Sequence, residues 1–474
     1  MQNRVLYYIT IVCLAGISFA FAFENALFWQ PSFREDISQP LNAYYLTGNP
    51  AAYLYEGNFQ EIRIGGRFDK MDYRRRYDPV SEQNLHAEFF TVRDIDNKSF
   101  FSTGISYDDY RKRDLFASME KDFYDDYFSM IDSTQGDVSY YGPRLQILYN
   151  VKLSENVFFG LEGNYGVERS LKDTFPQTIT IMRNSGYRAG LDFRKNAFNM
   201  GVFARYYDDQ ISYEAVKSYT NVKSHTYIGY NIFYNELPGS KTEKIRTRNG
   251  LEYGANLGFG KKTGFYGDFA VSGLHRISRS ELIRASHTYD RGLWLRQGLH
   301  VRGNLNYYSG EVAAFRFYGE LLQYEDWAES LISGALVIEN NERMARWGGM
   351  FIYKPSLVQE AYLGAESGTV HYDYIEYVFP FESSRSGNEW KLYTGSRLYV
   401  GPKTHFHVDL AYAKMIPRFY WDTESFRDTN IIIGLEQLFS FGYITIGFEY
   451  INRKPENDVE TISKYLFGLS YLRK

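Results

Sequence analysis

One predicted strand of this 474-residue chain carries side chains with the type and spacing to bind a metal or a substrate. His405 and His407 are two residues apart and Asp409 follows, so in an extended strand all three side chains point to one face. Two imidazoles and a carboxylate can bind a metal, but neighbours on a wet wall also simply hydrogen-bond to water and other side chains. Because an isolated pair rarely completes a metal site, we assign no metal, cofactor or catalytic residue.

Charged and apolar residues alternate in the same way along other segments. In residues 61–68, Ile62 and Ile64 share one face, and Arg63 and Arg67 share the other. The polar faces of such strands are predicted to line a lumen, and the set comprises Arg63, Arg67, Glu162, Asn164, Asp268, His300, Arg302, Arg316, Glu320, His405, His407, Asp409 and Glu449. Their mixed charges would either orient a polar solute in a channel or form an ion-pair network that fills the lumen and holds the barrel closed. The sequence leaves both alternatives open.

The strands that carry these residues are predicted to form a membrane barrel. Aromatic residues make up 18% of the chain, with 44 Tyr and 36 Phe, although the mean hydropathy is −0.42 and 23% of the residues are charged. This combination suits a barrel with an apolar outer band, aromatic girdles and a polar lumen. Beyond the first two dozen residues, no apolar run approaches the roughly 18 residues of a transmembrane helix. The predicted fold class is therefore all-β, a transmembrane antiparallel up-and-down β-barrel.

Turn-forming residues divide the predicted barrel into hairpins. Short turns are predicted at residues 95–97, 154–155, 195–196, 261–263, 309–310, 354–356, 401–402 and 440–442, and long polar loops at about 110–138, 208–246, 276–290, 325–342 and 375–388. With a first strand near 59–74 and a last near 461–473, the hairpins give about 18 strands, within a range of 16–20. Residues 221–235 would add two short strands or remain a loop. Outer-membrane barrels place their short turns in the periplasm, so both termini are predicted to be periplasmic.

The N-terminus has the pattern of a secretory signal. Arg4 precedes an apolar run, which ends in the small-x-small site Ala20-Phe21-Ala22. The predicted organisation is a signal peptide at residues 1–22, an irregular periplasmic or lumenal segment at 23–57, and an outer-membrane β-barrel at 58–474. The only cysteine, Cys13, lies in the signal, so the mature chain has no thiol. The predicted location is the outer membrane of a Gram-negative bacterium.

The residues Thr47-Gly48-Asn49-Pro50-Ala51-Ala52 resemble the Asn-Pro-Ala element that opens long-chain fatty-acid transporter-like barrels. The whole mature chain also resembles an uncharacterised group of Bacteroidota outer-membrane barrels, with the same start, Tyr-rich strands and overall length. In the transporter family this region forms a hatch inside the barrel. The resemblance therefore implies a short hatch-like segment at Asn49, Pro50 and Ala51, with Trp29 and Phe33 nearby. The predicted barrel differs from that family in having more strands and in having charged rather than apolar lumen faces.

Two basic runs, Arg74-Arg75-Arg76 and Arg111-Lys112-Arg113, lie at the outward ends of predicted strands. There they would contact the anionic outer leaflet, so outer-membrane lipid and lipopolysaccharide are predicted partners. The net charge of −4 gives no global basic field for nucleic acid. No enzyme motif is found, and no enzymatic activity is predicted. The leading hypothesis is a channel or transporter with a partly occluded lumen. The alternatives are a non-transporting scaffold that binds a lipoprotein or receptor, and a barrel hydrolase.

Overall fold

The computed structural model describes residues 48–52 and 57–473, with short gaps at 97, 119–120, 122, 126, 175–177, 216–224, 229–231, 236–241, 261–263, 285–286, 311, 332–333, 357–358, 378–380, 402–403, 419–420, 422, 440–441, 457 and 459. The predicted signal peptide and most of the segment 23–57, including Trp29 and Phe33, lie outside the described residues. Within the described residues, no helix is long and apolar enough to cross a membrane.

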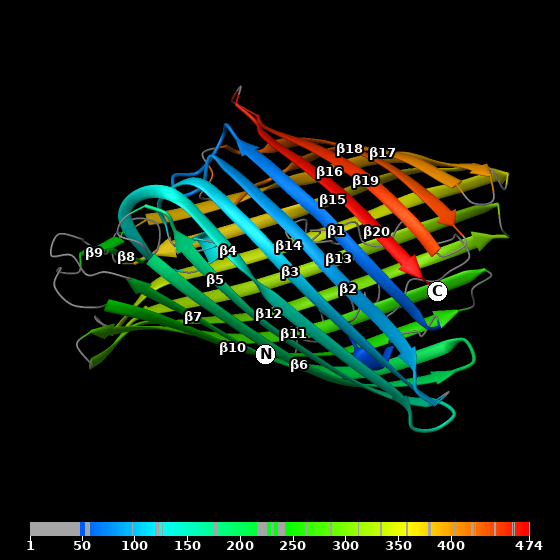
Figure 1. Ribbon diagram of the computed structural model, residues 1–474, viewed down its shortest axis with the longest axis horizontal. Helices are drawn as coiled ribbons and strands as arrows, with labels where there is room; N and C mark the ends of the chain where they lie inside the picture. Colours follow the sequence, from blue (N-terminus) through cyan, green and yellow to red (C-terminus); the bar gives the residue numbers. More distant parts are fainter. Residues whose placement is uncertain are drawn as a thin grey trace.

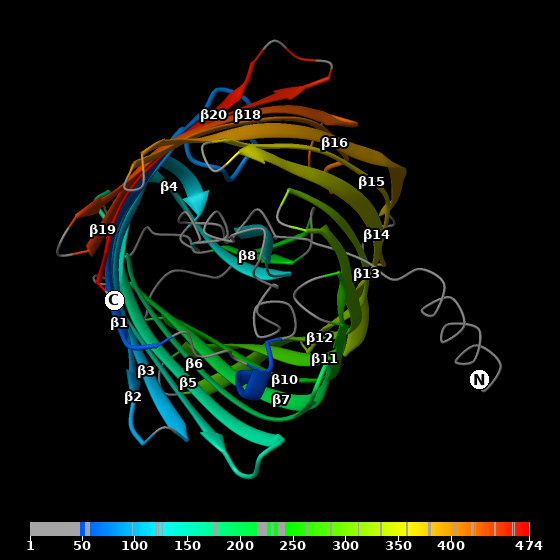
Figure 2. The same ribbon diagram turned by 90° about the vertical axis from the view of Figure 1, so that its right-hand side faces the viewer.

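The chain forms a closed antiparallel barrel of eighteen long strands, and β1 closes it by pairing with β20 (Figures 1 and 2). The strands are β1 (Phe59–Met71), β2 (Ser81–Asp94), β3 (Ser99–Ser118), β4 (Phe128–Lys152), β5 (Val157–Lys172), β6 (Thr178–Lys195), β7 (Phe198–Ala215), β10 (Thr242–Gly260), β11 (Phe265–Arg284), β12 (His287–Ser309), β13 (Ala313–Ser330), β14 (Ala335–Ser356), β15 (Gln359–Glu376), β16 (Phe381–Gly401), β17 (Thr404–Met415), β18 (Phe426–Phe439), β19 (Gly442–Pro455) and β20 (Ile462–Arg473). The predicted fold class and the count of about 18 strands are confirmed.

Two further short strands lie between β7 and β10. These are β8 (His225–Ile228) and β9 (Ile232–Asn235), which pair with each other, and β8 also pairs with the start of β4. They are not part of the barrel wall, because β7 pairs directly with β10. Along the barrel axis, β8 and the adjoining part of β4 lie across the opening (Figure 2). Of the two alternatives for residues 221–235, the pair of short strands is therefore correct.

Apolar and polar faces alternate along the strands as the period of two predicts. On β1, Ile62 and Ile64 are exposed on the outside of the barrel, whereas Glu61 and Asp69 are buried inside. β15, elsewhere in the wall, follows the same rule, since Leu363 is 65% exposed and Glu376 on the same strand is buried. The outward apolar side chains together form a surface that only a lipid environment would cover.

Part of the Tyr and Gly content is used on the inner face of the wall. Tyrosine rings lie flat over glycines of neighbouring strands, so that a Cβ at the glycine would meet the ring at 2.0–2.7 Å; the pairs are Tyr207 with Gly250, Tyr324 with Gly298, Tyr393 with Gly364, Tyr362 with Gly395, and Tyr318 with Gly348. A ring that lies along the wall does not extend into the lumen. The glycines therefore keep the centre of the barrel free of these rings.

The connections alternate between two ends of the barrel. The strand bounds agree with seven of the eight predicted short turns, of which 261–263 lies outside the described residues, whereas residues 354–356 belong to the end of β14. We call the end of the barrel with these short connections the turn end and the opposite end the rim. The predicted long loops are wrong in extent, because strands occupy most of them. Residues 276–290, for example, belong almost entirely to β11 and β12, which are separated only by 285–286. Beyond the bilayer both faces of a strand are polar, as in the outward ion pair of Arg279 with Asp290 at 2.7 Å, so the apolar alternation is lost and the sequence resembles a loop.

Candidate functional site in the barrel lumen

A short 3₁₀ helix, η2 (Pro50–Ala52), docks on the inner face of the wall near the turn end (Figure 2). It contacts β4, β5, β6 and β7. The Asn49 amide donates to the Leu191 carbonyl at 3.1 Å and to Oδ1 of Asn256 at 2.9 Å, and Oδ1 of Asn49 accepts the backbone N–H of Ala51 at 3.0 Å. Asn49 has no exposed surface, and its side chain hydrogen-bonds both to the backbone of η2 and to the barrel wall.

Two wall side chains complete the attachment by donating to the carbonyls of η2. Nδ2 of Asn150 lies 2.9 Å from the Pro50 carbonyl oxygen and 3.2 Å from that of Ala51, and the Arg194 guanidinium also donates to Ala51. A buried carbonyl without a donor costs about 1–3 kcal/mol, so these donors are needed once η2 is inside the barrel.

Three glycines on adjacent strands make the space that η2 occupies. A Cβ on Gly160 would lie 2.3 Å from the Pro50 carbonyl carbon, and Cβ atoms on Gly190 and Gly201 would lie 2.0 and 2.5 Å from the Asn49 amide group. Side chains cannot approach so closely, so any other residue at these positions would displace η2. We call Gly160, Gly190 and Gly201, with Asn150 and Asn256, the η2 socket.

Above the socket, four charged side chains form a row across β5, β6, β7 and β10. Glu162 pairs in register with Arg188, Arg188 with Arg205, and Arg205 with Glu252. Nη1 of Arg188 lies 2.9 Å from Oε2 of Glu162, whereas Nη1 of Arg205 is 3.8 Å from Oε2 of Glu252. The Arg188 guanidinium also lies beside Gly48, 3.5 Å from its ideal Cβ position, which places the start of η2 next to this row.

The remaining residues predicted to line the lumen point inward in several separate groups. Three of them contact a carboxylate: Arg63 pairs with Glu61 at 2.7 Å, Arg67 with Asp69, and His300 with Glu320. Two others make hydrogen bonds, since Nε of Arg316 donates to Asn306 at 2.9 Å and Asn430 donates to Glu449 at 2.7 Å. Asn164 lies against Gly186, and Asp268 is buried beside Gly258. Most of these contacts are local ion pairs or hydrogen bonds within the wall. Arg302 faces Glu320 across the β12–β13 register but makes no hydrogen bond with any described residue.

His405, His407 and Asp409 share the inner face of β17 but do not converge. The His407 ring lies against Gly434, Nδ1 of His405 is 3.9 Å from Glu436, and Asp409 lies against Gly395. Among the described residues, no group of three or more His, Cys, Asp or Glu side chains could hold a metal ion.

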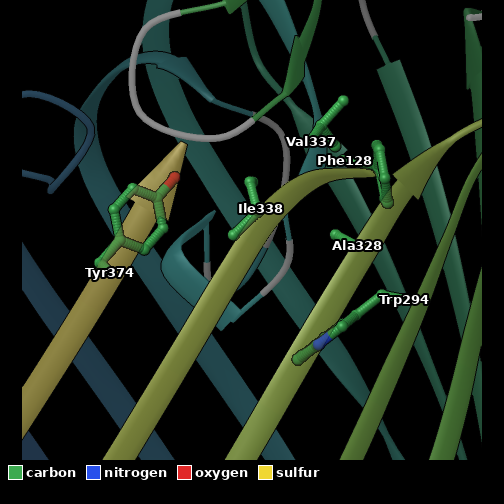
Figure 3. Close-up of a cluster of buried hydrophobic side chains, with 6 residues drawn as sticks. All are labelled: Phe128, Trp294, Ala328, Val337, Ile338 and Tyr374. Atoms are coloured by element: carbon green, nitrogen blue, oxygen red, sulfur yellow. The ribbon is translucent and has the colours of Figure 1, made fainter. Parts of the chain in front are cut away.

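The chain also turns inward at the rim. Phe128 leaves the wall at the start of β4 and packs on Trp294, Ala328, Val337, Ile338 and Tyr374 of the opposite side (Figure 3). The Tyr127 hydroxyl donates to Asp326 at 3.0 Å, and Lys244 donates to the Phe128 carbonyl. We call residues 127–131 the rim segment, in which residues 128–131 also pair with β8.

A second rim connection, between β17 and β18, is held by one guanidinium. Arg385 of β16 donates to the carbonyls of Pro417, Arg418, Trp421 and Thr423 at 2.9–3.2 Å. Arg418 in turn pairs with the lumenal Glu342 at 2.9 Å. The described residues of this connection are therefore held against the lumenal side of the wall at the rim.

The residues within each of the two basic runs differ in exposure. Arg74 and Arg76 are exposed at the rim, as are Arg111 and Arg113 on β3. Lys112 is buried and lies 3.5 Å from Glu82, so its predicted lipid contact is wrong, because strand alternation turns the middle residue inward. The same prediction is wrong for Arg75, which pairs with Asp78 and stacks on Tyr124 and Trp421, 3.7 and 4.7 Å from their ring centroids.

Residues 50–326 match the model of a family described as a family of unknown function (DUF6850), which is more than half of the chain. The chain belongs to this family. The matched region begins at η2 and includes the socket and the charged row. A search of curated proteins finds no match.

Among solved structures, the chain is similar to the siderophore receptor PiuA from Acinetobacter baumannii, with 7% identity over 88% of this chain and 82% of that chain and a TM-score of 0.45. It is similar to the ferric preacinetobactin receptor BauA from the same species, with 7% identity, coverage of 88% and 80%, and a TM-score of 0.42. It is also similar to the Pseudomonas putida toluene transporter TodX, with 10% identity, coverage of 91% and 93%, and a TM-score of 0.33. No residue role is carried over from them.

Sequence reasoning missed the five residues of the η2 socket and three of the four residues of the charged row. Arg188, Arg205 and Glu252 alternate with outward Tyr187, Tyr206 and Tyr253, so their inward direction was readable from the period of two. That they face one another was not readable, because it depends on the register between strands.

Proposed function

We propose that the chain is an outer-membrane channel or transporter for a polar solute, with a lumen narrowed by η2 near the turn end and by the rim segment at the other end. The single observation that carries this proposal is the docking of η2 in a socket of three glycines inside a charged lumen. A barrel of this strand number is wide enough for an aqueous passage. The residues that would restrict the passage are held by hydrogen bonds and contacts that can be broken.

In this proposal the turn end faces the periplasm of a Gram-negative cell, and Asn49, Pro50 and Ala51 act as the attachment point of a hatch formed by residues 23–57. Short turns on the periplasmic side and long strand extensions on the outer side are the usual arrangement of outer-membrane barrels. The exposed Arg74, Arg76, Arg111 and Arg113 would contact lipopolysaccharide phosphates at the rim.

The test is single-channel conductance in planar bilayers. The refolded mature chain is compared with a variant that lacks residues 23–57, after heat-modifiable gel mobility has shown that both are folded. We expect the open probability or the conductance to increase on deletion, because the socket would be empty. Absence of current from both folded proteins would overturn the proposal and favour the scaffold alternative.

A further inference from the structure

The charged row in the lumen places two like charges where a barrel would ordinarily avoid them. Arg188 and Arg205 are direct cross-strand neighbours on β6 and β7, and both point into the lumen. Directly opposed residues have Cβ atoms about 4.5–5.5 Å apart, and like charges in this arrangement destabilise the pair. The row therefore has a charge order of minus, plus, plus, minus, from Glu162 to Glu252, with the two guanidinium groups in the middle.

The flanking carboxylates neutralise this pair unequally. Glu162 is buried and accepts a charge-assisted hydrogen bond of normal length, 2.9 Å, from Nη1 of Arg188. Glu252 is 3.8 Å from Arg205, which is beyond hydrogen-bond distance. The side chain of Arg205 is 34% exposed and makes no hydrogen bond with any described residue, so its donors face the lumen.

The guanidinium of Arg205 also lies near an aromatic ring. Its guanidinium lies 5.6 Å from the centroid of the Tyr207 ring, and that ring lies flat on Gly250. An aromatic ring under a guanidinium orients its plane without using its N–H groups. Arg302 on β12 is not part of this row, since it faces the buried Glu320 across the β12–β13 register.

We infer that Arg188 and Arg205 form a binding site for a solute that carries a carboxylate or phosphate group. The inference rests on the proposed function, because it names the class of solute that the lumen would take. A planar or tetrahedral anion placed between two neighbouring guanidinium groups accepts paired N–H bonds and removes their repulsion. The site also adjoins the η2 attachment, because the Arg188 guanidinium lies against Gly48.

The experiment is isothermal titration calorimetry on the full mature chain in detergent at low ionic strength, with sodium succinate and inorganic phosphate as separate probes. We expect saturable binding of at least one probe to the wild type and at least 10-fold weaker binding to Arg205→Gln. Arg205 is preferred to Arg188 as the target because its loss leaves the Glu162–Arg188 pair intact. Binding should weaken as salt is added, because partly exposed charges are screened.

The matched control is Arg169→Gln, which removes an exposed arginine on the outer side of β5 and should bind as the wild type does. Succinate binding alone would assign a carboxylate solute, and phosphate binding alone a phosphorylated one. No saturable binding of either probe, or equal binding by the wild type and Arg205→Gln, would overturn the inference. Conductance without anion binding refutes this inference and leaves the channel, whereas anion binding without conductance refutes the channel and leaves the site.

Discussion

A methyl group added at Gly160 tests whether η2 is held by the shape of its socket. In Gly160→Ala the new Cβ would lie 2.3 Å from the Pro50 carbonyl carbon and 2.4 Å from the Ala51 nitrogen. Ordinary contacts begin at 3.4 Å, so η2 must move by about 1 Å. The hydrogen bonds from Asn150, now 2.9 and 3.2 Å long, would then exceed 3.5 Å.

The loss can be estimated from these two bonds. A buried hydrogen bond contributes about 1 kcal/mol net, and a buried carbonyl left without a donor costs about 1–3 kcal/mol. We therefore expect docking of η2 to weaken by about 2–4 kcal/mol, which corresponds to roughly a 30- to 1,000-fold decrease in the docking equilibrium constant. The barrel itself should stay intact, because the methyl group points into the lumen and leaves the ladder of β5 unchanged.

The assay is thiol labelling at Ala52, which is 1% exposed when η2 is docked. The predicted mature chain has no cysteine, so Ala52→Cys introduces a unique thiol. Its reaction with a water-soluble maleimide should be slow alone and at least 10-fold faster with Gly160→Ala. The control is Gly163→Ala on the outer face of the same strand, where a Cβ meets nothing within 4 Å. Equal labelling rates in the Gly160→Ala and Gly163→Ala backgrounds would refute the socket.

Three further predictions concern the rim. Phe128→Ala removes a buried ring, which costs about 3–5 kcal/mol locally, so the connection before β4 should be cleaved faster by protease than in the wild type; an unchanged rate would contradict the packing in Figure 3. Arg385→Gln removes the donor shared by four carbonyls, so hydrogen exchange of residues 416–425 should accelerate, whereas unaltered protection would show that another contact holds them. The hydrogen bond from Ser425 holds the pKa of Glu456 below its usual range, with Lys414 adding to the effect. This contact is present above the ordinary carboxyl pKa and is lost as the pH falls through the lowered value, so exchange near Ser425 should rise only under acidic conditions, and a flat profile would argue against it.

The period of two was enough to predict which side of each strand meets lipid. Ile62 and Ile64 are outside and Asp69 is inside because successive side chains of a strand point to opposite faces, whatever the strand pairs with. Most of the short turns were also predictable, because turn-forming residues separate the strands there. The rim ends of the strands were not predictable, because polar residues on both faces leave no alternation to follow.

The sequence by itself determined the barrel class, the approximate number of strands and the inward direction of residues such as Arg63 and Glu162. Only the tertiary structure decided that Gly160, Gly190 and Gly201 line one space, and that Arg188 faces Arg205. The physical reason is that alternation is a property of one strand, whereas register is fixed jointly by the pairing of all strands around the closed barrel. A single-residue slip between β6 and β7, for example, would preserve the alternation within each strand but would separate Arg188 from Arg205.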